Sequence, residues 1–140
     1  AIPLAIANPQ LSVSMVEAKV RKSAFLREAV RTLGLRAQVW TSRFEALLSD
    51  PGMHEFADIL SLRAVRVDVR TLASIQAFVK PGGRFFLFRP TGNVGDITTP
   101  PTIGFSEAVP LVESLRSQLI ILEKRRVGRA SSVSRGTSST

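Results

Sequence analysis

The chain has 140 residues, a net charge of +8 and an apolar fraction of 44%, which suits one globular domain. It contains no cysteine, and this excludes a disulfide framework and a thiolate zinc site and fits a reducing compartment such as the cytoplasm. No apolar run approaches the roughly 20 residues that a membrane-spanning helix needs, so we expect no membrane association.

The basic residues gather toward the end of the chain. Five basic residues and one acidic residue lie between Glu123 and Thr140. Such a surplus favours a polyanionic partner such as RNA, although a generally arginine-rich proteome would produce it too. Residues 127–140 are mostly Ser, Thr, Gly and Arg, so we expect a globular domain over residues 1–126 followed by a disordered basic tail.

The first residues look like the end of a helix. The segment from Ile2 to Ala7 is apolar, and Asn8-Pro9 should terminate it because the residue before a proline avoids the helical region. The segment lacks the basic leader of a signal peptide and an initiator Met. We therefore expect the sequence to begin inside a longer chain.

The stretch from Leu11 to Leu33 is the clearest part of the pattern. Leu11 to Val16 predicts a buried strand, and the acidic Glu17 stands where that strand should end. A basic helix should follow from Lys19, with an apolar stripe at three- and four-residue spacing, and Gly34 should end it in the left-handed conformation.

The remaining elements continue the alternation of strands and helices. Ser42 and Glu45 have the spacing of a capping box for a short helix, and residues 80–83, Lys-Pro-Gly-Gly, predict a turn. The strand Arg84 to Phe88 is very apolar and does not alternate, which favours cover on both faces. Further strands are expected over residues 35–40, 56–62, 103–111 and 118–124, and a further helix over residues 68–79.

This order predicts an α/β fold with a mostly parallel sheet and a C-terminal antiparallel hairpin. A carboxylate at the carboxyl end of a parallel strand, as expected for Glu17, commonly holds the hydroxyls of a ribose. Two nucleotide-binding folds meet this description. A nicotinamide-binding Rossmann domain would continue with further βα units, whereas a terminal hairpin favours the class I methyltransferase sheet.

A set of motifs in a fixed order resembles one family. The segment Ile2 to Leu35, the helix motif Lys22-Ser-Ala-Phe-Leu26, and Ser42-Arg-Phe-Glu45 are followed by an Arg63-Ala64 pair and by Lys80-Pro-Gly-Gly83. Together they are similar to the bacterial small-subunit ribosomal RNA guanine-N7 methyltransferases of the RsmG (GidB) family, over roughly Ile2 to Arg125. The resemblance implies a Rossmann-like class I methyltransferase domain that uses S-adenosylmethionine.

The resemblance also implies roles for four residues. Glu17 would accept hydrogen bonds from both ribose hydroxyls of the cofactor, Phe44 and Glu45 would border the adenine, and Arg63 would lie beside the transferred methyl group. Three of them also have a plainer interpretation: Glu17 as a solvated loop residue, Glu45 as part of a capping box, and Arg63 as a surface residue at a strand end. No residue is assigned a catalytic or metal-binding role.

Three departures from the family pattern are visible. The first strand of the family, which lies in the centre of the sheet, is missing, as is the glycine-rich loop that normally cradles the methionine end of the cofactor. Leu62 stands where the family often has Ser, and Arg89-Pro90 replaces a Lys-Gly pair. The first departure predicts that these 140 residues by themselves bind the cofactor poorly.

The expected reaction needs few special side chains. The N7 atom of guanine carries a free lone pair and can attack a methyl sulfonium without losing a proton, so alignment is the main requirement. The implied partners are ribosomal RNA and the small ribosomal subunit, with a monomeric enzyme in the cytoplasm. The alternatives are a nicotinamide-dependent oxidoreductase fragment and a non-catalytic RNA-binding module.

Overall fold

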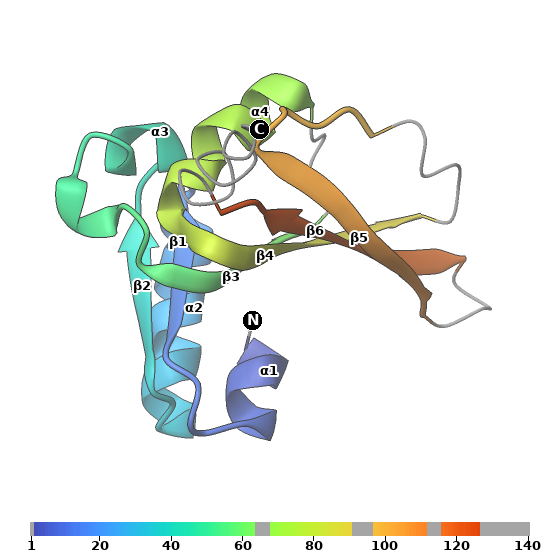
Figure 1. The fold of residues 1–140 in the computed structure, drawn as a ribbon. Coiled ribbons are helices and arrows are strands. Elements are labelled where there is room, and N and C mark those ends of the chain that lie inside the picture. Colours follow the sequence, from blue (N-terminus) through green and yellow to red (C-terminus); the bar gives the residue numbers. More distant parts are fainter. Residues whose placement is uncertain (1, 64–67, 91–96, 112–115, 127–140) are drawn as a thin grey trace, which may run out of the picture. The chain divides into compact units, whose positions relative to one another are not determined.

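The computed structural model describes residues 2–63, 68–90, 97–111 and 116–126, so the expected basic tail lies outside the described residues. The chain divides into two compact units, Ala1–Asp50 and Pro51–Thr140. Figure 1 shows the elements of both units in sequence colours, and each unit is described by itself. Among the described residues, no helix has the length and apolar character required to cross a membrane.

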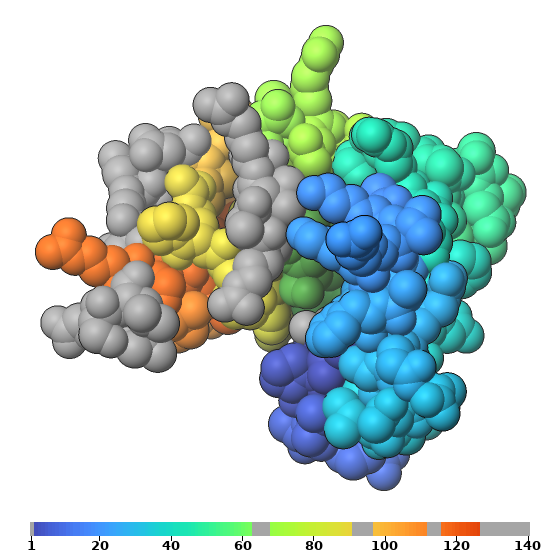
Figure 2. All heavy atoms as spheres, turned by 180° about the vertical axis from the view of Figure 1, so that it is seen from behind, coloured from blue at the N-terminus to red at the C-terminus, as the bar shows by residue number. Residues whose placement is uncertain are grey.

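The first unit is a βαβ arrangement with short helices at each end. Strands β1 (Val13–Glu17) and β2 (Ala37–Thr41) pair in parallel, so that Val13 lies opposite Ala37 and Glu17 opposite Thr41. Helix α2 (Val20–Leu33) connects them and packs against both. Helices α1 (Ile2–Ala7) and α3 (Phe44–Leu47) precede β1 and follow β2. In Figure 2 the outer surface of α2, in light blue, faces the viewer.

Helix α2 begins and ends as the sequence predicts. Gly34 adopts φ +61°, and its N–H donates to the carbonyl of Arg31, which satisfies part of the last turn. Ser23 is completely buried, and its hydroxyl is hydrogen-bonded to the hydroxyl of Thr41 at the end of β2. This polar contact fixes the helix against the carboxyl end of the sheet.

The predicted capping box of α3 is wrong. The helix starts at Phe44 with Arg43 at the N-cap, and no side chain caps it. The backbone of Arg43 is still extended, so Glu45 occupies the second helical position, whereas a capping box requires the third. The hydroxyl of Ser42 donates to the carbonyl of Arg43 instead.

The second unit contains a four-stranded mixed sheet in the order β3-β4-β6-β5. Strands β3 (Ala57–Arg63) and β4 (Val79–Pro90) are parallel, and β6 (Ser117–Lys124) runs antiparallel to β4 and to β5 (Ile103–Pro110). The predicted hairpin is therefore confirmed. The 3₁₀ turn η1 (Pro51–Met53) precedes β3.

The core of this unit lies on one face of the sheet. Phe85 and Leu87 of β4 pair with Leu122 and Ile120 of β6, and all four side chains are buried. Phe86 and Phe88, on the other face of β4, are only half-buried. Both faces of β4 are therefore covered, as expected, but one face is buried more fully than the other. Partial burial of the second face explains why apolar residues occupy both faces of the strand.

Two boundaries around β4 differ from the prediction. Helix α4 (Val69–Ile75) gives way to a 3₁₀ turn, η2 (Gln76–Phe78), so that Val79 belongs to a strand and not to a helix. Residues 80–83 do not form a turn that precedes a strand, because β4 runs through them. Ala57 pairs with Val79 and Ile59 pairs with Arg84. Between these two pairs the chain advances by five residues in β4 but by only two residues in β3. The segment is a bulge within the strand.

The strands form two separate sheets. The sequence predicts a single sheet without its first strand. Within the described residues, β1 pairs only with β2, and β3 pairs only with β4. Each therefore has one edge without a described partner.

Candidate functional site

Glu17 is the last residue of β1 and is half-buried. One of its carboxylate oxygens, Oε2, accepts a hydrogen bond of 2.9 Å from the backbone N–H of Lys19, the N-cap residue of α2. Glu17 has no other side-chain hydrogen bond within the described part of the chain. The carboxylate is therefore oriented by one oxygen and can accept further donors.

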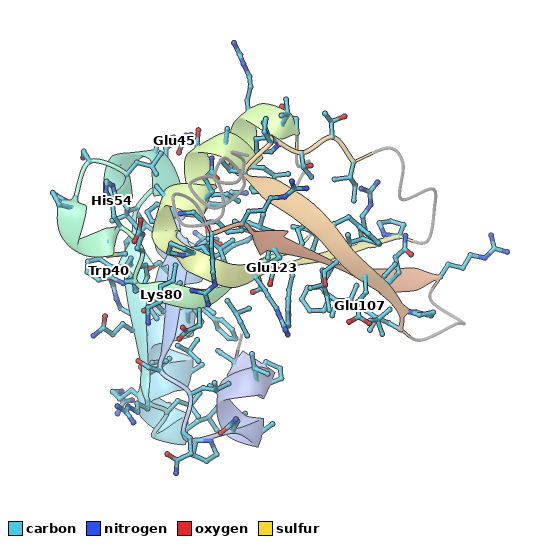
Figure 3. The ribbon with its side chains drawn as sticks, in the orientation of Figure 1. Trp40, Glu45, His54, Lys80, Glu107 and Glu123 are labelled. Atoms are coloured by element: carbon cyan, nitrogen blue, oxygen red, sulfur yellow. The ribbon has the colours of Figure 1, made fainter. Side chains whose placement is uncertain are left out.

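The chain that follows β2 returns to Glu17. The N–H of Ser42 donates to the carbonyl of Glu17 at 3.1 Å, and Thr41 is the register partner of Glu17. Helix α3 starts two residues later, with Phe44 half-buried and Glu45 exposed. Glu17, Phe44 and Glu45 thus belong to one edge of the first unit, formed by the carboxyl ends of β1 and β2. Figure 1 shows α3 beyond the end of β2, and Figure 3 labels Glu45 on that helix.

Arg63 belongs to the second unit. It is the last residue of β3, and its backbone pairs in register with Phe88 of β4. It stands at the carboxyl end of a parallel strand, which is where the sequence predicts it. The structure brings the other three predicted residues together in the first unit and leaves Arg63 outside that group.

This arrangement suits the binding of a polyhydroxylated ligand. An ionised carboxylate offers two acceptor oxygens, and hydrogen bonds to charged acceptors are stronger than neutral ones. Phe44 adds a partly buried ring within three residues of β2. The carboxyl edge of a parallel βαβ unit is also the usual place for a nucleotide.

The sequence-based search missed a second group of residues, at the bulge of β4. Lys80, Arg84 and Arg126 line an open pocket there together with two glycines. In the sequence, Lys80 and Arg84 flank a Pro-Gly-Gly segment. That composition is typical of a turn, so no binding site was predicted there.

Comparison with protein families gives a match over residues 1–100 to the GidB model, described as rRNA small subunit methyltransferase G. A relative from Stenotrophomonas maltophilia, called ribosomal RNA small subunit methyltransferase G, is 48% identical over 92 residues. That alignment covers 65% of this chain and 37% of the relative. A relative of the same name from Nocardioides is 35% identical over 121 residues, which cover 84% of this chain and 47% of the relative. The chain spans less than half the length of these relatives.

Several solved structures have a similar fold. A putative methylase from Haemophilus influenzae has a TM-score of 0.61 at 14% identity, covering 82% of this chain and 73% of that one. A putative methyltransferase from Escherichia coli has a TM-score of 0.63 at 12% identity, covering 81% and 64%. MtNAS in complex with S-adenosylmethionine has a TM-score of 0.61 at 17% identity, covering 83% and 46%. The fold is that of the class I methyltransferases.

Proposed function

This chain belongs to the GidB family, rRNA small subunit methyltransferase G, and from that membership we propose that the protein transfers a methyl group from S-adenosylmethionine to N7 of a guanine in small-subunit (16S) ribosomal RNA. The family match over residues 1–100 is the single observation that carries the proposal. We further propose that the protein acts as a monomer in the cytoplasm and that its partner is ribosomal RNA or the small ribosomal subunit.

In the proposed site, Glu17 binds the ribose of the cofactor. The Lys19 N–H anchors one carboxylate oxygen at 2.9 Å, which leaves acceptor capacity for the two ribose hydroxyls. Phe44 and Glu45 border the adenine in this proposal, and Arg63 lies beside the methyl group. The anchored carboxylate and the half-buried ring of Phe44 fit such a ligand, because they offer a charged acceptor and an apolar surface at the same edge of the first unit.

When bound, S-adenosylmethionine supplies an electrophilic methyl group on a sulfonium. Guanine N7 carries a free lone pair that would accept this methyl group as its bond to sulfur breaks, so the protein does not have to remove a proton first. The task of these residues is to hold both reactants in line, and alignment of this kind can supply a large part of the rate acceleration. The proposal accordingly assigns no side chain as a general base.

The nicotinamide-dependent alternative is less well supported. In a Rossmann dehydrogenase the chain after β4 would continue with parallel βα units. Here β6 is antiparallel and lies between β4 and β5. This hairpin favours the methyltransferase proposal over an oxidoreductase.

A methyl-transfer assay tests the proposal. A chimera is made in which this segment replaces the matching stretch of the Stenotrophomonas maltophilia relative, and it is incubated with S-adenosylmethionine and 16S rRNA that lacks the modification. The expected result is 7-methylguanosine at one position of the RNA, detected by nuclease digestion and mass spectrometry. A folded chimera that leaves the RNA unmodified, while the intact relative modifies it, would contradict the proposal.

A further inference from the structure

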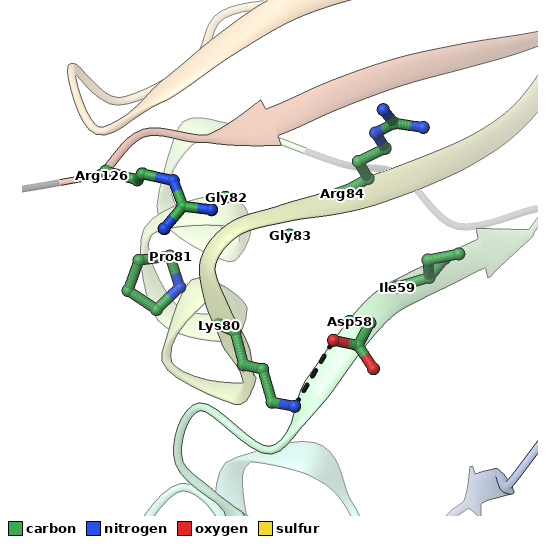
Figure 4. A pocket seen from close by; sticks show the side chains of 8 residues that line it. All are labelled: Asp58, Ile59, Lys80, Pro81, Gly82, Gly83, Arg84 and Arg126. Atoms are coloured by element: carbon green, nitrogen blue, oxygen red, sulfur yellow. Dashed lines mark ion pairs between the residues drawn. The ribbon is translucent and has the colours of Figure 1, made fainter.

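The bulge of β4 lines an open pocket of about 420 Å³ in the second unit. Lys80, Gly82, Gly83 and Arg84 contribute from β4, Asp58 from β3, and Arg126 from the segment just after β6 (Figure 4). We call this group of residues the bulge pocket. It lies at the amino end of β4, whereas Arg63 lies at the carboxyl end of the neighbouring parallel strand. The pocket is therefore separate from the edge that the parallel strands present for catalysis.

The two glycines allow the backbone and a guanidinium to come close together. A Cβ at Gly83 would lie 2.5 Å from Val79 Cγ1 and 2.9 Å from the carbonyl oxygen of Asp58, so no side chain fits there. Gly82 has φ +86°, and a Cβ on it would lie 2.8 Å from Arg126 Nη2. The guanidinium of Arg126 thus lies directly over the backbone of the bulge, as Figure 4 shows.

The bulge is held in place from inside the unit. Val79, its first residue, is completely buried. The ammonium group of Lys124, which is also buried, donates to the carbonyl oxygens of Val79 and Gln76 at 2.8 Å each. A bulge fixed in this way adds little backbone ordering cost on binding.

Cations outnumber carboxylates around the bulge pocket. Lys80 Nζ lies 3.4 Å from Asp58 Oδ1, and both side chains are at least half exposed, so this ion pair is weak. Glu123 is the register partner of Arg84. Among the described residues, however, neither Arg84 nor Arg126 has a carboxylate within 4 Å. The two guanidinium groups remain available to an outside anion.

The chemistry of these side chains selects the ligand. A guanidinium matches the geometry of phosphate oxygens with two parallel hydrogen bonds, and a lysine adds a point charge. We propose that the bulge pocket binds a backbone phosphate of the RNA substrate, through Arg126 and Arg84 with support from Lys80. The choice of RNA as the source of the phosphate rests on the proposed function. The pocket then contributes to RNA affinity without contacting the methyl donor.

The test measures binding of the 140-residue chain to a fluorescently labelled single strand of 16S rRNA by anisotropy over a salt series. Arg126→Gln and Arg84→Gln are compared with Arg70→Gln, an exposed arginine of α4 outside the pocket. Each pocket variant should weaken binding by about tenfold, the effect of one lost charged hydrogen bond. It should also reduce the slope of log affinity against log salt, by up to about 0.7, the value for one phosphate contact on a single strand. Arg70→Gln should change neither quantity by a comparable amount.

Arg126→Lys separates a shaped site from a general positive field. The lysine keeps the charge and the salt slope, but without the two-pronged contact it should still lose affinity. Equal losses in Arg126→Gln and Arg70→Gln, or no loss in either, would overturn the proposal, provided that the melting temperatures match. The methyl-transfer assay is independent of this comparison. An active chimera with pocket variants that bind RNA normally would reject the bulge pocket alone, and an inactive chimera with the pocket effect intact would reject the methyltransferase proposal alone.

Discussion

At the scale of single residues, Glu17 shows how much a local pattern can establish. An apolar run followed by one acidic residue and a helix start predicts a carboxylate at the end of a strand. The structure places Glu17 there, with its Oε2 held by the Lys19 N–H. The hydrogen bond to Lys19 could not be predicted, because it depends on the backbone angles between the strand and the helix.

Asp68 provides a prediction about pH. Its carboxylate caps α4 and accepts the N–H of Thr71 at 2.8 Å, and this hydrogen bond lowers the pKa of Asp68 below its usual value. A lowered pKa means that the ionised form is bound more tightly in the folded state, so the stabilisation is present above about pH 4 and is lost as the pH falls through the folded pKa.

Thermal melts of the wild type, Asp68→Ala and Asp68→Asn test this role. Asp68→Ala should melt at a lower temperature than the wild type at pH 7, and the gap should narrow as the pH falls below about 4. Asp68→Asn should retain most of the stability at pH 7, since Asn is also a good N-cap, and should not show the same narrowing. A constant gap for Asp68→Ala across this range would contradict the role of the carboxylate.

Lys124 is the buried cation of the second unit, and its removal should be costly. Lys124→Met keeps most of the aliphatic chain but removes the ammonium donor from the carbonyls of Gln76 and Val79. Among the described residues, the Gln76 carbonyl then keeps only the backbone N–H of Val79. We expect a loss of about 1–3 kcal/mol in the free energy of unfolding, measured by urea denaturation. The matched variant Arg125→Met, on an exposed neighbour, should lose much less. Equal effects in both would show that the buried hydrogen bonds contribute little.

At the scale of elements, apolar periodicity and helix-terminating residues gave correct predictions where the structure of a segment depends only on its local sequence. Helix α2 starts and stops within a residue of the prediction because its stripe and Gly34 are local features. The bulge in β4 was predicted as a turn because Lys80-Pro-Gly-Gly83 has the composition of a turn. Only the pairing of Val79 with Ala57 and of Arg84 with Ile59 shows that the strand continues, and that pairing is not visible in the local sequence.

Gly83 lies in the bulge and is closely surrounded, whereas Gly34 at the end of α2 is not, so alanine substitutions at these two positions test the packing of the bulge. Gly83→Ala should destabilise the fold by about 1–3 kcal/mol, because its Cβ would collide with Val79 Cγ1 and the Asp58 carbonyl. Gly34→Ala meets no atom within 4 Å and should cost only the strain of its positive φ, about 1–2 kcal/mol. Adding the alanine at Gly83 should also disturb the bulge, whereas that at Gly34 should leave it intact. Urea denaturation gives both values, and a Gly83→Ala variant as stable as the wild type would contradict the packing.

At the scale of the whole molecule, the order of elements was enough to predict the fold class. The antiparallel hairpin after β4 distinguished a methyltransferase sheet from a dehydrogenase, and the fold comparison agrees. The candidate site could be predicted only in part. Glu17, Phe44 and Glu45 belong to one βαβ unit, which is short in sequence, whereas Arg63 is the last residue of a strand in another sheet. The bulge pocket joins residues up to 68 positions apart, from Asp58 to Arg126, and sequence spacing carries no signal for such a contact.

The most direct test of the central claim, that Glu17 holds the ribose of the methyl donor, is calorimetric titration of S-adenosylmethionine into the chimera. Glu17→Gln should raise the dissociation constant by about ten- to a hundredfold, since it removes charge-assisted hydrogen bonds. Glu28→Gln, an exposed glutamate of α2, should leave the constant within about twofold, as expected for a surface position. An unchanged dissociation constant in a folded Glu17→Gln chimera would contradict the role of Glu17.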